Sequence, residues 1–246
     1  MQHLTFEIHR PILSKRLTQG WGENKACIDL ATKRIRSVNA KGICPAGSVP
    51  YYPTVGLPHG HNGLDLSAIH GELVYHSGNF DGIMHVEKDR VGGIGVDVVS
   101  KEPIWFDGVP PNGLTPVYQD PNGFTAYVKI RYWHLLNAIG FDGKEVKYGQ
   151  PIGRADSTGA SSATHLHFAP KWCDEDSYGL ASDNGFQGAF DPTPFYNHNI
   201  FAGDIAEAYS PPLPPMTPEE KKEDVLVSFH WRVVLLLQQL IHQLTK

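Results

Sequence analysis

The chain has 246 residues, and its 21 Lys and Arg against 26 Asp and Glu give a formal net charge of −5. This length allows one large β-rich domain or two small ones. The charge excludes proteins that bind nucleic acid through a strongly basic face. The 25 glycines and 19 prolines favour many turns and short strands over long helices.

Residues 1–57 are rich in turn residues, so we expect short strands and long loops over one side of a domain. Their first residues show no basic segment followed by an apolar run, so no secretory signal is predicted and synthesis in the cytoplasm is expected. Cys27 and Cys44 could form a disulfide in an oxidising environment, and the third cysteine is Cys173. The sequence contains no C-x-x-C pair, so a zinc site made of cysteine thiolates is not expected.

Residues 61–170 alternate in a strand-like pattern, as in "GVDVVSK" and "YVKIRYWHL". A long loop is expected at 102–126, between two of these strands. Its aromatic residues Trp105, Phe106 and Tyr118 either pack back on the loop or form one wall of a substrate groove. We expect that they form a groove wall and that the segment therefore influences substrate specificity.

The C-terminal part changes composition twice. Residues 171–209 are loop-rich and are placed with the preceding strands in one domain, 1–209, whereas "SPPLPPMTPEE" at 210–220 predicts a stiff linker. Residues 221–246 predict an amphipathic helix, with an apolar stripe at 3–4 spacing within 225–244. We expect this stripe to fold back on the domain or to self-associate. Contact with a membrane surface is the alternative.

The stretch "ATHLHFAP" places His165 and His167 two residues apart in a predicted strand. Side chains at this spacing share one face, and Leu166 and Phe168 then face the core on the other side. One alternative is that these are core histidines, each hydrogen-bonded to a neighbour. However, imidazole is the commonest metal ligand in proteins, so a pair on one face favours a metal site.

The stretch "HGHNGLDLS" at 59–67 adds His61 and Asp65, with Gly63 between them permitting a tight turn. A catalytic zinc site needs about three protein ligands and an open position for water. His61, Asp65 and one histidine of the His-x-His pair supply that set. The other histidine of the pair and His134, in "RYWHLLN", remain for proton transfer and oxyanion stabilisation.

Three motifs, "HNGLD", "YWHLL" and "THLHF", occur in this order, joined by connectors that include "GQPIG" and "STG". Together they resemble the signature of the lysostaphin-type (LytM-like) peptidoglycan zinc metalloendopeptidases over residues 58–170. The resemblance implies a mainly β fold, a small antiparallel β-sandwich with an open groove. It also implies that His61, Asp65 and His167 bind Zn²⁺ and that His134 and His165 are catalytic.

The activity implied by the resemblance is hydrolysis of a stem or cross-bridge peptide bond in bacterial peptidoglycan. A bacteriolytic phage endolysin or virion-associated lysin, reaching the cell wall after release, is the expected setting. A bacterial enzyme whose leader has been removed is the alternative. Nucleic acid is not an expected partner.

Two departures from the family pattern are the long 102–126 segment and Trp133, which stands where a small residue is usual. Both are expected to affect specificity rather than the metal. His59 is not expected to be a ligand. His70, His76 and His85 are expected at the surface or in turns.

Two alternative functions were weighed against hydrolysis. A non-catalytic wall-binding or amidase-activating module on the same fold would have lost ligands, and all five positions are intact. A cupin-type metal enzyme would use "HGHNGLD", but its second motif would place Asp156 where a histidine is needed and would leave "THLHF" unused.

Overall fold

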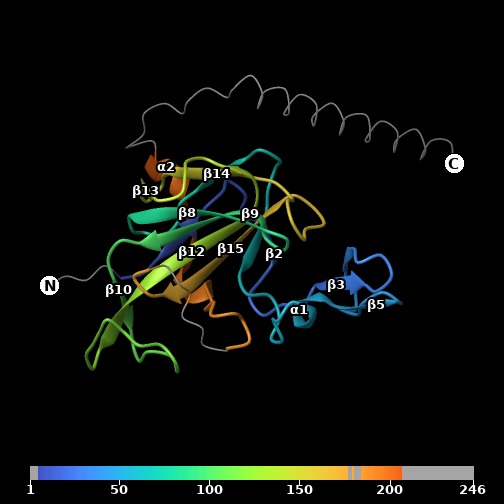
Figure 1. The fold of residues 1–246 in the computed structure, drawn as a ribbon, viewed down its shortest axis with the longest axis horizontal. Coiled ribbons are helices and arrows are strands. Elements are labelled where there is room, and N and C mark those ends of the chain that lie inside the picture. The colour runs from blue at the N-terminus through green and yellow to red at the C-terminus, as the bar shows by residue number, and fades with distance from the viewer. Residues whose placement is uncertain (1–4, 177–178, 180–183, 207–246) are drawn as a thin grey trace, which may run out of the picture. The chain divides into compact units, whose positions relative to one another are not determined.

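The computed structural model describes residues 5–176, 179 and 184–206, which form a mainly β structure with few and short helices (Figure 1). The predicted linker at 210–220 and the predicted helix at 221–246 lie outside these residues, so both stay predictions. Among the described residues, no helix has the length and apolar character needed to cross a membrane.

The largest sheet has 11 strands, all paired antiparallel, with the order β13-β8-β9-β12-β15-β6-β2 along its main path. The predicted antiparallel β architecture is therefore confirmed. The strands of this sheet are β2 (Leu17–Gln19), β6 (Leu64–Ser67), β7 (Leu73–Tyr75), β8 (Gly82–Asp89), β9 (Gly93–Ser100), β10 (Ile104–Asp107), β11 (Tyr118–Gln119), β12 (Gly123–Ala138), β13 (Lys144–Val146), β14 (Pro151–Ala155) and β15 (His165–Cys173).

Two smaller sheets and three short helices complete the described structure. A parallel pair joins β1 (Ile8–Arg10) to β16 (Tyr196–Phe201). A three-stranded sheet has the order β4-β3-β5 and lies beside α1 in Figure 1. The remaining bounds are β3 (Ala26–Asp29), β4 (Ile35–Ser37), β5 (Ser48–Pro50), α1 (Tyr51–Thr54), the 3₁₀ helix η1 (Thr193–Phe195) and α2 (Ala202–Ala206).

Strand β12 runs through the centre of the large sheet and pairs with β9, β10, β11, β14 and β15. Its core-facing residues are β-branched or aromatic, as expected for a buried strand, and Val128, Ile130 and Tyr132 are fully buried. Near its C-terminal end the pairing with β9 shifts register between Tyr132 and Leu135. This irregularity contains His134, so a bulge in the central strand turns that side chain toward the site described below.

The 102–126 segment does not form the predicted groove wall. It contains β10 and β11, which pair with the N-terminal end of β12 at residues 123–126. Trp105 and Phe106 are buried, and Phe106 packs among aromatic rings of the main core, including Phe6 and Phe124. Of these three aromatic residues only Tyr118 is exposed. No residue of 102–126 lines the cavity or the grooves around the histidine cluster described below.

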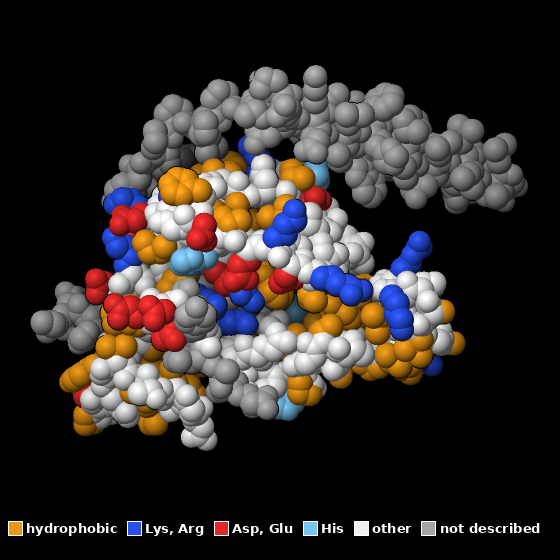
Figure 2. Space-filling model, in the orientation of Figure 1, with side chains coloured by type: hydrophobic (Ala, Val, Ile, Leu, Met, Phe, Trp, Pro, Cys, Tyr) orange, Lys and Arg blue, Asp and Glu red, His pale blue; other side chains and the backbone are white. Residues whose placement is uncertain are grey.

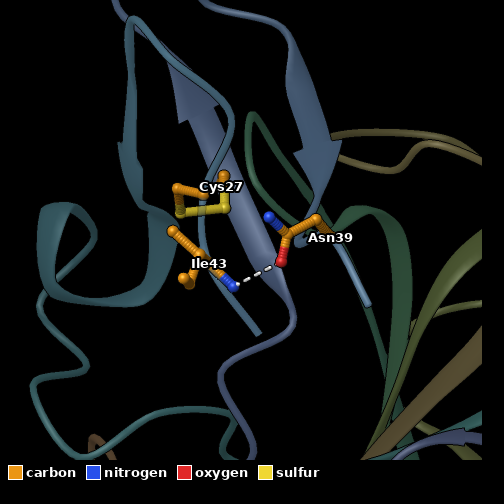
Figure 3. Close-up of a disulfide and its surroundings, with 4 residues drawn as sticks. Cys27, Asn39 and Ile43 are labelled. Atoms are coloured by element: carbon orange, nitrogen blue, oxygen red, sulfur yellow. Dashed lines mark hydrogen bonds between the residues drawn. A yellow bond between two sulfur atoms is a disulfide. The ribbon is translucent and has the colours of Figure 1, made fainter. Parts of the chain in front are cut away.

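The N-terminal part instead contains the small β4-β3-β5 sheet, with its own apolar cluster of Tyr51, Tyr52 and Leu57. A disulfide joins Cys27, on β3, to Cys44 (Figure 3). Beside it the Asn39 side chain accepts hydrogen bonds from the Ile43 and Lys41 backbone amides, which closes the turn seen in Figure 3. The disulfide and this turn constrain a small sheet whose strands have only three or four residues each.

His76 is not the surface or turn residue that we expected. Its side chain is fully buried between β7 and β8. Its Nε2–H donates to the Phe80 carbonyl at 2.8 Å, which leaves Nδ1 to accept from the Tyr132 hydroxyl at 3.2 Å. Burial lowers the pKa of His76 to about 4, so the imidazole is neutral at physiological pH.

Candidate metal centre and its surroundings

Three buried side chains, His61, Asp65 and His167, meet at one end of the large sheet. Asp65 lies on β6 and His167 directly opposite it on β15, so the antiparallel register alone brings them together. His61 lies just before β6, where its backbone exchanges hydrogen bonds with Gly22 and Glu23. The prediction that Leu166 and Phe168 face the core, opposite the two histidines of "THLHF", is confirmed because both are fully buried.

The three ligand atoms form a tight triangle. His61 Nε2 lies 2.8 Å from His167 Nδ1 and 3.1 Å from Asp65 Oδ1, and His167 Nδ1 lies 3.0 Å from Asp65 Oδ1. Ligand atoms about 2.0–2.2 Å from one tetrahedral ion lie roughly 3.3–3.6 Å apart. The edges of the triangle therefore need to lengthen by only roughly 0.2–0.8 Å to hold such an ion.

The hydrogen bonds around the triangle also suit a metal. The Nδ1–H of His61 donates to the Gly20 carbonyl at 3.0 Å, so its Nε2 presents a lone pair to the triangle. The Nε2 atom of His167 is buried and has no hydrogen-bond partner among the described residues. His167 Nδ1, in contrast, lies within hydrogen-bond distance of Asp65 Oδ1 and His61 Nε2, so Nδ1 is the ring nitrogen directed at the triangle. The donor set of two imidazoles and one carboxylate fits a catalytic zinc site.

The electrostatics favour a charged Asp65 carboxylate beside a neutral His167 ring. Burial alone would raise the pKa of Asp65, but the adjacent His61 and His167 hold it well below its usual range. Burial lowers the pKa of His167 to about 4. A metal site needs an ionised carboxylate and unprotonated imidazole, and Asp65 and His167 meet these two requirements before any cation binds.

His134 and His165 lie beside the triangle with their rings 4.6 Å apart. His134 Nδ1–H donates to the Thr158 carbonyl at 2.7 Å, and His165 Nδ1–H donates to the Ala163 carbonyl at 2.8 Å. In both rings Nε2 is therefore the free lone pair, and His165 Nε2 lies 3.8 Å from Asp65 Oδ1. Burial lowers the pKa of His134 to about 3, with the nearby His165 and His167 adding to the effect.

The structure thus brings together all five residues singled out in the sequence, as a group of three with two imidazoles beside it. The residues required by a cupin site do not converge. His59 Nδ1 donates to the Asn184 carbonyl, and Asp156 pairs with His70 at 2.9 Å.

Two residues around His167 act differently from the expectation. Gly63 has no left-handed backbone; a Cβ there would lie 2.6 Å from the Phe168 carbonyl and 2.7 Å from the His167 ring. Its role is close approach of the loop to β15, not a tight turn. Trp133 stacks on the His167 ring with centroids 5.4 Å apart, while the Arg131 guanidinium lies 4.8 Å from the Trp133 ring. Trp133 therefore supports a proposed ligand as well as lining the cavity.

An open cavity lies over the five residues and is lined by all of them. One wall comes from the β4-β3-β5 region and α1, including Ala26, Ile35, Tyr51 and Tyr52. The Tyr52 hydroxyl accepts a hydrogen bond from the Gln19 side chain, and its ring lies 5.6 Å from that of His61. Sequence reasoning missed this wall, and the only signal for it was the pair of tyrosines just before the first motif.

No protein-family model matches the chain, and no curated protein matches it. Solved structures do. The catalytic domain of the antimicrobial peptidase lysostaphin from Staphylococcus simulans is 24% identical, with 56% of this chain and 79% of that chain covered at a TM-score of 0.39. A zinc-containing peptidase from Vibrio cholerae is 22% identical; the match covers 71% of this chain and 41% of that chain, with a TM-score of 0.39. The prophage-encoded M23 protein EnpA from Enterococcus faecalis is 21% identical; the match covers 48% of this chain and 78% of that chain, with a TM-score of 0.32.

The chain's own geometry defines the class of site: a buried candidate metal centre of two histidines and one carboxylate, flanked by two further imidazoles, at the floor of an open cavity.

Proposed function

We propose that this protein is a zinc-dependent endopeptidase that hydrolyses peptide bonds in bacterial peptidoglycan. The observation that carries the proposal is the convergence of His61 Nε2, Asp65 Oδ1 and His167 Nδ1 beside two imidazoles that both present Nε2. Zinc held by these three atoms would lower the pKa of a bound water to roughly 7 and polarise the scissile carbonyl. The peptidoglycan substrate follows from the motif resemblance.

The protein's own residues then handle protons and charge. The free Nε2 atoms of His134 and His165 can accept a proton from the attacking water and return it to the leaving amine. An imidazole that becomes protonated also stabilises the developing oxyanion. The Thr158 and Ala163 carbonyls keep both rings in the tautomer that this exchange requires.

The setting that we propose is a phage endolysin or virion-associated lysin acting on the cell wall outside the cytoplasm. The Cys27–Cys44 disulfide supports a site of action in an oxidising compartment, since disulfides are rare in reducing cytosol.

Single alanine variants test the metal and catalytic roles separately. His61→Ala, Asp65→Ala and His167→Ala should each lose bound zinc, because each removes one of three protein ligands. His134→Ala and His165→Ala should keep the zinc and lose about 10²–10⁴-fold in turnover, as expected for a lost acid–base group. Metal analysis of the purified variants and release of new amino groups from purified peptidoglycan measure the two effects.

His59→Ala is the matched control, because this exposed histidine lies two residues from His61 and contacts the Asn184 carbonyl instead. It should keep both zinc and activity. Loss of zinc in His165→Ala with retention in His167→Ala would reverse the assignment of the pair. A zinc-loaded protein that binds peptidoglycan without releasing amines would instead establish a non-catalytic module.

A further inference from the structure

The cavity over the metal centre continues in two directions as solvent-open grooves. The lining of the first includes Arg16, Lys25 and Arg36. The lining of the second includes Lys33, Arg34 and Arg90. Both share lining residues with the central cavity, among them Ile35 and Ser162, so the three form one continuous channel.

The charge of this channel is opposite to that of the chain. Its lining contains six Lys and Arg, and the proposed metal ligand Asp65 is the one carboxylate among the described lining residues. The whole chain has a net charge of −5. In Figure 2, Lys and Arg side chains without neighbouring Asp or Glu lie at the right of the view, over the three-stranded sheet, whereas both charges occur over the centre and left of this face.

The two grooves differ in how many of their cations are already neutralised. In the first, Lys25 pairs with Glu23 at 2.7 Å and Arg36 with Asp29 at 2.8 Å. In the second, the described structure gives Lys33, Arg34 and Arg90 no carboxylate within ion-pair distance, and all three are exposed. The second groove therefore concentrates uncompensated positive charge on one side of the metal centre.

These cations come from two separate parts of the structure. Lys33 and Arg34 lie in the turn between β3 and β4, on the N-terminal wall. Arg90 lies in the turn between β8 and β9 of the large sheet. A chain lying in the groove is thus within reach of guanidinium groups from both walls, which suits carboxylates projecting from either side.

From this asymmetry we propose that the substrate is a peptide with free carboxylates on one side of the scissile bond, seated in the groove of Lys33, Arg34 and Arg90. This inference rests on the proposed function and narrows it to carboxylate-bearing stem peptides. An uncharged oligoglycine cross-bridge offers nothing for these three side chains to neutralise.

The test compares three defined peptides with the full-length, zinc-loaded chain: a stem peptide with its glutamate α-carboxylate free, the same peptide amidated there, and an oligoglycine. The variant K33Q/R34Q/R90Q should lose about tenfold in kcat/KM on the free-carboxylate peptide, mainly through KM, since each exposed charge pair contributes little. It should change little on the amidated peptide. The loss should shrink at high ionic strength because exposed pairs are screened.

K88Q/K101Q/K147Q is the matched control, with the same change of charge at three exposed residues outside the channel. It should behave as wild type. Equal cleavage of all three peptides, or equal losses on the free and amidated ones, would overturn the inference while leaving the peptidase intact. If no peptide is cleaved, the proposed function fails, and fluorescence anisotropy of the labelled free and amidated peptides still decides whether the groove selects carboxylates.

Discussion

The backbone of His134, one of the two proposed catalytic histidines, has an unusual conformation. Its φ of +64° places a non-glycine residue in the left-handed region, which is unfavourable and persists only where the surroundings enforce it. Here its amide donates to the Gly92 carbonyl, its carbonyl accepts from the Asp156 amide, and its ring donates to the Thr158 carbonyl. The conformation is held from three sides, which fits a side chain that must be positioned precisely.

Thr158 is a positioning residue in this arrangement. Its hydroxyl donates to the Leu135 carbonyl at 2.7 Å and accepts from the Ile94 amide at 3.0 Å, so it fixes the carbonyl that holds His134. We expect Thr158→Val to keep zinc and KM but to lower kcat about tenfold, because a misplaced acid–base group costs rate. Steady-state kinetics with metal analysis measure this. Thr158→Ser, which keeps the hydroxyl, should restore kcat; a loss of stability with unchanged kcat would contradict the role.

The proposed ligands and catalytic histidines could be read from the sequence because their spacing is short and their pairing follows from strand geometry. His165 and His167 share a face of one strand, and the first motif places His61 and Asp65 four residues apart. The supporting residues could not be read. Thr158 and Trp133 act through contacts with residues far away in the chain. Gly63 matters because a side chain there would collide with β15.

At the scale of elements, the wall of the cavity comes from the N-terminal sheet and not, as we had expected, from the 102–126 segment. The sequence shows that 102–126 is aromatic and turn-rich, but not that it pairs with the far end of β12. It shows that residues 1–57 are irregular, but not that β3, β4 and α1 border the cavity. Long-range strand pairing decides both, and no local pattern encodes it.

The disulfide should matter most for this N-terminal wall. Cys27 and Cys44 are 17 residues apart, and closing a loop of about this length stabilises by roughly 3 kcal/mol in the chain-entropy model. Reduction should therefore speed hydrogen exchange of residues 26–50 and raise KM, since these residues line the cavity, while zinc content stays unchanged. C27S/C44S should reproduce the effect and no longer respond to reductant. Unchanged exchange in reduced wild type would show that the sheet holds without the bond.

For the molecule as a whole, buried neutral histidines link stability to pH. An unfolded histidine has a pKa of about 6.5, whereas burial lowers that of His76 to about 4 and that of His167 to about 4. The unfolded chain therefore binds more protons between these values. The stability that these rings contribute is complete above pH 6.5 and is lost progressively as the pH falls toward 4.

His76 gives the cleanest test because it lies apart from the metal centre, whose own histidines respond to zinc. At pH 5 the wild type should have lost about 2 kcal/mol of unfolding free energy through His76 alone, relative to neutral pH. Because glutamine cannot be protonated, the free energy of unfolding of His76→Gln should fall by about 2 kcal/mol less than that of the wild type between pH 7 and pH 5, whatever its value at neutral pH. Urea denaturation of the two metal-free proteins at several pH values measures how each free energy of unfolding depends on pH. The exposed His198→Gln is the control and should keep the wild-type slope; an equal slope in His76→Gln would mean that this ring accepts its proton without unfolding the core.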